Sequence, residues 1–79
     1  MPQVECSRCK RSADGLERPP LPGEVGQAVA AHTCVACWKE WLAAQVMLIN
    51  EQGLSPANPE HYQRLVDEMR VFLVLEPGD

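Results

Sequence analysis

The stretch HTCVACWKEW, residues 32–41, combines two features that bear directly on the fold. Cys34 and Cys37 stand three positions apart, and the only two tryptophans of the chain, Trp38 and Trp41, follow at once. Positions i and i+3 of a helix face the same way, so a helix that starts here points both thiols in one direction. The stretch therefore predicts the start of a buried helix that presents a pair of sulfurs.

Outward from this stretch, the signals of a long helix are complete. Thr33 is a favourable N-cap residue, and neither proline nor glycine follows until Gly53, which stands where a helix C-terminal glycine belongs. We predict a helix over residues 34–52. Its apolar stripe is interrupted only by a glutamine and consists of Trp38, Trp41, Leu42, Gln45, Leu48 and Ile49.

Two further helices flank it. Asn58 and Pro59 give an N-cap followed by proline at the first helical position, and an unbroken apolar spacing predicts a helix over 59–74 that packs antiparallel to the second across a short loop. Its apolar positions are Tyr62, Leu65, Val66, Met69, Phe72 and Leu73. Upstream, Pro22 precedes a shorter helix over 23–31, which has weak intrinsic propensity and needs packing to hold it.

The N-terminal segment, residues 1–22, has little helical character. We expect a short extended piece at 3–6, a turn through Cys6–Arg11 and a return piece at 15–18, with Asp14-Gly15 as a turn signal. The fold class is therefore a mostly α, small α+β protein: one domain of three helices with an N-terminal hairpin or knuckle, stapled by a four-cysteine metal site.

Composition limits the partners and the compartment. The net charge is −4, and the 7 basic residues among the 79 are scattered, so a nucleic-acid partner is not expected. No apolar run reaches the ~20 residues that span a bilayer, and no secretion signal is visible. We expect a cytoplasmic protein that does not enter the membrane, a monomer, whose cysteines stay reduced.

The four cysteines form two identical pairs, Cys6-x-x-Cys9 and Cys34-x-x-Cys37, with 24 residues between them. Two such pairs can surround one ion with four thiolates, with Zn–S bonds of ~2.3 Å. The second pair gains from the helix N-terminus, which favours negative charge. The pattern predicts a closed, structural zinc site with these four residues as the metal ligands. Basic residues at positions 8, 10 and 11 would offset part of its negative charge.

Other interpretations of the cysteines remain open. They can be four unrelated core residues, since free cysteine is often buried as a small hydrophobe. One pair can be a redox dithiol at a helix start. Fe²⁺ is the alternative ion, because rubredoxin-like sites use the same thiolates, although Lys10 and Trp38 stand where rubredoxins carry glycine. His32 is a candidate second-layer donor to the metal site.

Two longer strings resemble a known family. Leu-Pro-Gly-Glu-Val-Gly at 21–26 and Gln-Val-Met-Leu-Ile-Asn-Glu at 45–51, together with Cys6, Trp38 and Trp41, are similar in kind and order to the bacterial Fe(II)-trafficking proteins, also called oxidative-damage protection proteins. The family carries one cysteine in this region, which corresponds to Cys6. This chain is therefore a variant with two CxxC pairs.

The resemblance implies a small cytosolic, non-enzymatic protein of three helices and a hairpin that supports iron–sulfur cluster supply or repair, protects against oxidative damage, and acts through a protein partner, such as an iron–sulfur protein. The alternatives are a zinc-ribbon-like adaptor with no iron role, and a dithiol redox protein. Asn50 and Glu51 are candidates for contact with a partner or with labile Fe²⁺, or are simply solvated.

Overall fold

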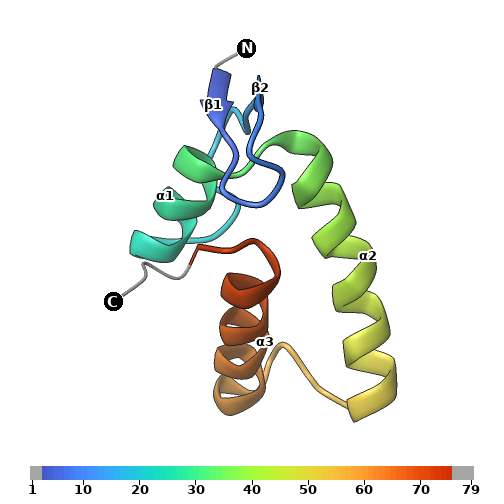
Figure 1. The fold of residues 1–79 in the computed structure, drawn as a ribbon. Helices are drawn as coiled ribbons and strands as arrows, with labels where there is room; N and C mark the ends of the chain where they lie inside the picture. Colours follow the sequence, from blue (N-terminus) through green and yellow to red (C-terminus); the bar gives the residue numbers. More distant parts are fainter. Residues whose placement is uncertain (1–2, 76–79) are drawn as a thin grey trace.

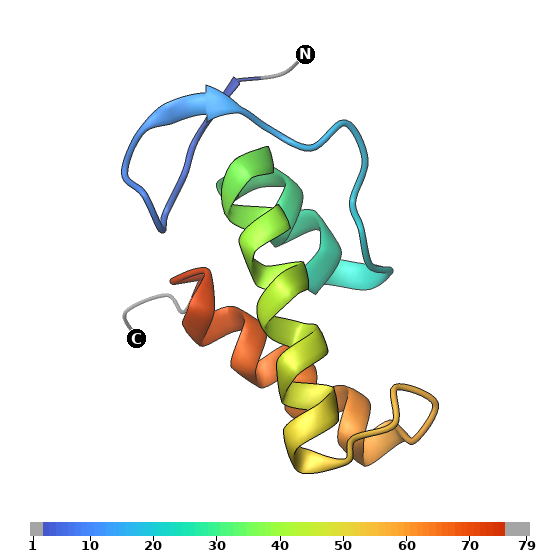
Figure 2. The ribbon, with the colours of Figure 1, turned by 90° about the vertical axis from the view of Figure 1, so that its right-hand side faces the viewer.

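The computed structural model describes residues 3–75, so the outer ends of the predicted domain, 1–2 and 76–79, lie outside the described residues. Two short strands are followed by three helices (Figure 1), in the order β1 Gln3–Glu5, β2 Ser12–Asp14, α1 Gly23–His32, α2 Val35–Gln52 and α3 Pro59–Phe72. The predicted class, three helices with an N-terminal hairpin, is confirmed. The hairpin and α1 cover the start of α2, while α3 returns beside α2 from the far end (Figures 1 and 2).

The hairpin returns earlier than predicted. β1 and β2 pair antiparallel with Val4 opposite Ala13, so the return piece is 12–14 and not 15–18. The reason is the tight closure of the turn, in which the Cys6 N–H donates to the Arg11 carbonyl at 2.9 Å and pairing resumes at once. Asp14 and Gly15 are then not a turn: Gly15 forms an isolated bridge to Cys34, and a Cβ there would lie 2.7 Å from Val4 Cγ1.

Helix α1 depends on close backbone packing. Gly26 is buried, and a Cβ at this position would lie 1.7 Å from the carbonyl oxygen of Leu21. The loop before the helix therefore crosses directly over its second turn, which only glycine allows. Val29 is fully buried on the same helix. The string Leu-Pro-Gly-Glu-Val-Gly is thus a packing motif, and its last glycine is a steric requirement.

Helix α2 begins one residue later than predicted, and Thr33 is not its N-cap. The cap position is Cys34, whose backbone is extended because it pairs with Gly15, and the cap makes no side-chain hydrogen bond. Thr33 is instead the residue that ends α1; its hydroxyl is buried without a hydrogen-bond partner among the described residues. At the other end Gly53 has φ 63° and closes the helix as predicted.

Helix α3 follows its sequence signals closely. The Asn58 side chain accepts hydrogen bonds from the backbone N–H groups of Glu60 (2.9 Å) and His61 (3.2 Å). The buried residues are Leu65, Val66 and Met69, as the spacing predicts. The helix ends at Phe72, two residues before the predicted 74, because Val74 takes a left-handed φ of 56°.

The core lies at the junction of all these elements. Its fully buried members include Val29, Trp41, Met69 and Leu73, and three of the cysteines belong to the same cluster. Trp41 packs against Phe72 with ring centroids 5.6 Å apart. The predicted stripe of α2 is wrong at Leu42, which is 42% exposed, because it lines an open pocket between α2 and α3 together with Tyr62 and Leu65.

Candidate metal centre

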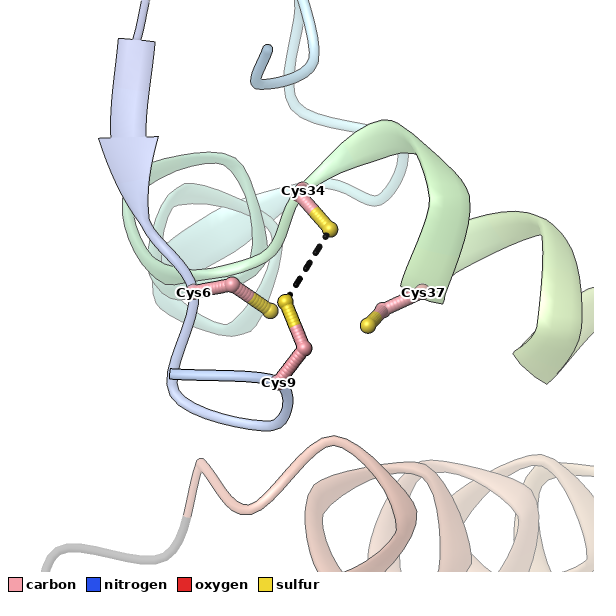
Figure 3. Close-up of side chains that lie close together, drawn as sticks. All are labelled: Cys6, Cys9, Cys34 and Cys37. Atoms are coloured by element: carbon pink, nitrogen blue, oxygen red, sulfur yellow. Dashed lines mark hydrogen bonds between the residues drawn. The ribbon is translucent and has the colours of Figure 1, made fainter. Parts of the chain in front are cut away.

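All four predicted ligands meet at one point. The sulfurs of Cys6, Cys9, Cys34 and Cys37 all lie within 4.8 Å of one another, and those of Cys9 and Cys34 are 3.8 Å apart. Figure 3 shows the four side chains directed toward a common centre, two from the turn after β1 and two from the start of α2. Three of the cysteines are buried and Cys9 is half-buried; all four are free thiols.

The turn after β1 is built to project two sulfurs. The Lys10 N–H donates to the Cys6 carbonyl at 2.9 Å, which closes a tight turn around the first pair. Lys10 has φ 63°, the left-handed conformation that glycine adopts most easily. Residues 6–11, called here the knuckle, therefore have the backbone of a glycine-containing metal knuckle although lysine occupies that position.

The second pair uses the end of a helix. Cys34 is the N-cap residue of α2 and Cys37 lies in its first turn, where the Trp38 N–H already bonds to the Cys34 carbonyl at 3.0 Å. No acidic residue lies in this first turn. The unpaired N–H groups of a helix N-terminus favour negative charge, so the position suits thiolates.

Backbone donors also make Cys6 acidic. Burial raises the pKa of its thiol, but hydrogen bonds from the backbone of Cys9, Cys34 and Arg8 outweigh that effect and lower the pKa to about 6. Such N–H donors stabilise a thiolate in the same way whether the negative charge is free or bound to a cation. Both halves of the site therefore supply donors toward sulfur.

Arg8, between the first two cysteines, connects the site to the helices. Its guanidinium donates to Cys37 Sγ at 3.6 Å, forms an ion pair with Glu40 at 2.8 Å, and lies 4.3 Å from the centre of the Phe72 ring. Burial, together with hydrogen bonds to the other three thiols, raises the pKa of Cys37 to about 12 against the lowering effect of Arg8. The hydrogen bond to Cys37 raises the pKa of Arg8 itself.

Basic residues were expected to offset part of the negative charge of the site. Arg8 is placed to do so, whereas Lys10 and Arg11 are exposed. The ring of His32 is not part of the four-sulfur group; the His32 backbone carbonyl accepts the Ser7 N–H at 2.8 Å. Ser7 Oγ also lies 2.8 Å from the Leu73 carbonyl, which ties the knuckle to the end of α3.

Sequence reasoning missed three contributors to this site: Ser7, Glu40 and Phe72. Ser7 and Arg8 occupy the two variable positions of the first C-x-x-C, which is a usable signal, since side chains there lie beside the sulfurs. Nothing local marks Phe72, which comes from α3, far along the chain. Asn50 and Glu51 lie in the last turn of α2 and do not join the cysteine group.

The donor set fits a tetrahedral ion. With Zn–S bonds of ~2.3 Å, the sulfurs of a tetrahedral site lie about 3.8 Å apart. The Cys9 and Cys34 sulfurs are at this distance, and all four lie within 4.8 Å of one another. Four unrelated core cysteines have no reason to converge in this way. The arrangement can hold a metal ion through four thiolates, and no other His, Asp or Glu between residues 3 and 75 joins the group.

None of the three helices described between residues 3 and 75 is both long and apolar enough to cross a membrane.

Fold and site together define a small helical protein with a four-thiol cluster able to bind a metal. Comparison with known proteins makes the family explicit: residues 1–78 match the model of the family described as bacterial Fe(2+) trafficking. The chain belongs to this family, as the two sequence strings predicted.

Similar proteins cover most of the chain. One called "Probable Fe(2+)-trafficking protein" in Alkalilimnicola ehrlichii is 46% identical over 69 residues, 87% of this chain and 78% of the relative. A protein of the same name in Xanthomonas oryzae pv. oryzae is 46% identical over 76 residues, 96% of this chain and 83% of the relative. One in Paraburkholderia phymatum is 38% identical over 76 residues, 96% and 84% of the respective chains.

Proposed function

We propose that this protein is a small, non-enzymatic, cytoplasmic iron-handling protein whose fold is stapled by a structural zinc ion on Cys6, Cys9, Cys34 and Cys37. It would support iron–sulfur cluster supply or repair and protection against oxidative damage, acting through a partner protein or transient Fe²⁺. The supporting observation is the convergence of four thiols in a member of the Fe(2+) trafficking family.

Zinc is favoured as the resident ion for two reasons. Thiolates are soft ligands that suit zinc, and a site with four protein sulfurs is closed, as structural zinc sites are. A closed site is poorly suited to an ion that must be delivered. Iron as cargo would then bind elsewhere, or transiently, and the zinc would maintain the shape that a partner recognises.

Metal analysis of the protein purified without added metal tests the structural part. We expect one colourless zinc per chain, and its loss in a Cys34→Ser variant. A Met47→Ser variant, changed at an exposed position on the same helix, is the matched control and should keep its zinc. A red ferric–thiolate spectrum would show that the site holds iron and not zinc. Metal-free protein with free thiols would contradict the proposal.

Anaerobic titration with Fe²⁺ tests the iron-handling part. We expect the zinc-loaded protein to bind Fe²⁺ weakly, with the zinc retained, and deletion of the gene to lower iron–sulfur enzyme activity. Absence of both effects would favour the second candidate, a zinc-stapled adaptor with no iron role. The closed four-sulfur geometry is the observation that favours this candidate.

A redox dithiol is the third candidate, supported by the 3.8 Å approach of the Cys9 and Cys34 sulfurs. It requires turnover of a disulfide substrate, which four zinc-bound thiolates would not support. A disulfide-reductase assay on zinc-loaded and chelated protein distinguishes it: we expect no turnover in either state.

A further inference from the structure

A second feature lies away from the cysteines, between α2 and α3. A groove with a cavity volume of about 350 Å³ runs beside Trp41 and Phe72, which form part of its floor with Leu48. Met47 of α2 and Val71 of α3 line it as well. The groove lies between residues 41–51 of α2 and residues 68–72 of α3.

The apolar residues of this groove are unusually open to solvent. Met47 is 61% exposed and Val71 is 71% exposed, although each could have been replaced by a polar residue at no cost to the core. Apolar groups from two different helices that gather around an aromatic floor are typical of a surface that binds another molecule. A groove between two helices accepts a third helix by its apolar face.

The charge around the groove indicates what kind of segment fits. Within residues 3–75, its only charged lining residues are Glu51 and Glu68, one from each helix, and no basic residue lines it. The whole chain carries a net charge of −4. A second copy of this chain would bring the same carboxylates against each other, so charge complementarity favours a basic occupant.

We propose that the groove lined by Met47, Val71, Glu51 and Glu68 binds an amphipathic helical segment of a partner protein, in which a large apolar side chain is flanked by lysine or arginine. The apolar side chain packs on the aromatic floor between Met47 and Val71, and the basic groups pair with Glu51 and Glu68. This inference rests on the proposed function in one respect: the groove would be the surface that binds the protein partner proposed there.

The groove is physically connected to the cysteine cluster. Arg8 contacts both Cys37 Sγ and the Phe72 ring, and Phe72 packs on Trp41, so the floor of the groove is held by groups that the metal site positions. Binding is therefore measured on the zinc-loaded protein. Failure of binding there leaves the metal and Fe²⁺ results untouched, so the two proposals fail separately.

The experiment is a titration of isotope-labelled, zinc-loaded protein with a synthetic helical peptide of leucine and lysine, followed by nuclear magnetic resonance. We expect shifts at the Met47 and Val71 methyl groups and the Trp41 indole. A second peptide with every lysine replaced by glutamate should bind at least roughly tenfold more weakly, because it meets the two carboxylates.

Matched variants locate the site. Met47→Glu and Val71→Glu should each weaken binding by roughly tenfold or more, since a carboxylate replaces an apolar contact. Val46→Glu is the control: Val46 is 57% exposed on the same helix but does not line the groove. Met47→Glu and Val46→Glu add the same charge to α2, and that charge by itself attracts a basic peptide. A loss of binding in Met47→Glu without one in Val46→Glu therefore identifies the groove.

Replacing both rim carboxylates, Glu51→Gln with Glu68→Gln, should weaken the basic peptide several-fold and reduce the salt dependence of binding. Zinc content and thermal unfolding verify that each variant is folded. Equal loss in Val46→Glu, equal binding of the acidic peptide, or shifts centred elsewhere would overturn the proposal. Concentration-dependent shifts in the groove without peptide would overturn it in favour of a second copy.

Discussion

The two halves of α2 lie in different environments. In the first half, Cys37 is 3% exposed and Trp41 is 2% exposed, and the knuckle, α1 and the end of α3 surround them. In the second half, Val46 is 57% exposed and Met47 is 61% exposed. A chain of 79 residues cannot bury both. Its interior is concentrated where the sulfurs meet, and the opposite half is left as surface for another molecule.

Removal of a metal ligand should have the largest effect on stability. It should also expose the first half of α2, so that the two halves no longer differ in burial. Structural zinc sites contribute ~10–16 kcal/mol of apparent binding free energy to folding. We expect Cys34→Ser, or chelation of the wild type, to abolish cooperative thermal unfolding as followed by circular dichroism. Met47→Ser should change the free energy of unfolding by less than ~0.5 kcal/mol. Equal stability of the two variants would show that the cluster does not staple the fold.

A single methyl group on α1 tests the cysteine half without touching a sulfur. Gly26→Ala places a Cβ against the Leu21 carbonyl, and overpacking of this kind costs ~1–3 kcal/mol or more. Chemical denaturation of the zinc-loaded protein measures the loss. Gln27→Ala, at the exposed neighbouring position, should lie within ~0.5 kcal/mol of the wild type. A neutral Gly26→Ala would mean that the loop does not cross the helix so closely.

In metal-free protein kept folded at low temperature by a stabilising osmolyte such as sucrose, with the fold verified by circular dichroism, the four thiols should be unequal. Cys6 has a folded pKa of about 6, below its ordinary 9.0, so its contribution to stability is complete above pH 9, declines as the pH falls toward 6 and is lost below that. Thiolate absorbance during a pH titration should reveal one early ionisation, absent in Cys6→Ser. Cys37, with a pKa of about 12, should ionise last. Four thiols that titrate together would contradict this order.

Thr33→Val should have the smallest effect, and its sign is informative. If Thr33 were the N-cap of α2, this substitution would lower the free energy of unfolding by ~1 kcal/mol. Because the Thr33 hydroxyl is instead buried without a partner among the described residues, the substitution should leave the free energy of unfolding unchanged or raise it by up to ~1 kcal/mol. Valine keeps the shape of the side chain and removes the unsatisfied group. Thermal unfolding of the zinc-loaded variant distinguishes the two outcomes.

Local signals predicted what depends on local structure. The Asn58-Pro59 start, the α3 spacing and the Gly53 end were all readable, and the repeated C-x-x-C spacing predicted that four sulfurs meet. The start of α2 could not be predicted from local sequence. Cys34 pairs with Gly15, a residue distant in sequence, and this bridge makes Cys34 the N-cap in place of Thr33. The predicted burial of Leu42 was wrong for a similar reason. Periodicity gives the apolar face of a helix, but not how much of that face a partner helix covers.

The strained turn at Lys10 also bears on how fast an ion bound by the four thiols would be exchanged. A side chain in the left-handed region costs roughly 1–2 kcal/mol, which the closed knuckle must carry and which its opening releases. This strain favours opening of the turn, through which Cys6 and Cys9 are attached to the chain. An ion held by the four thiols would then leave sooner than from a relaxed knuckle with glycine at this position, and Lys10→Gly should slow its exchange.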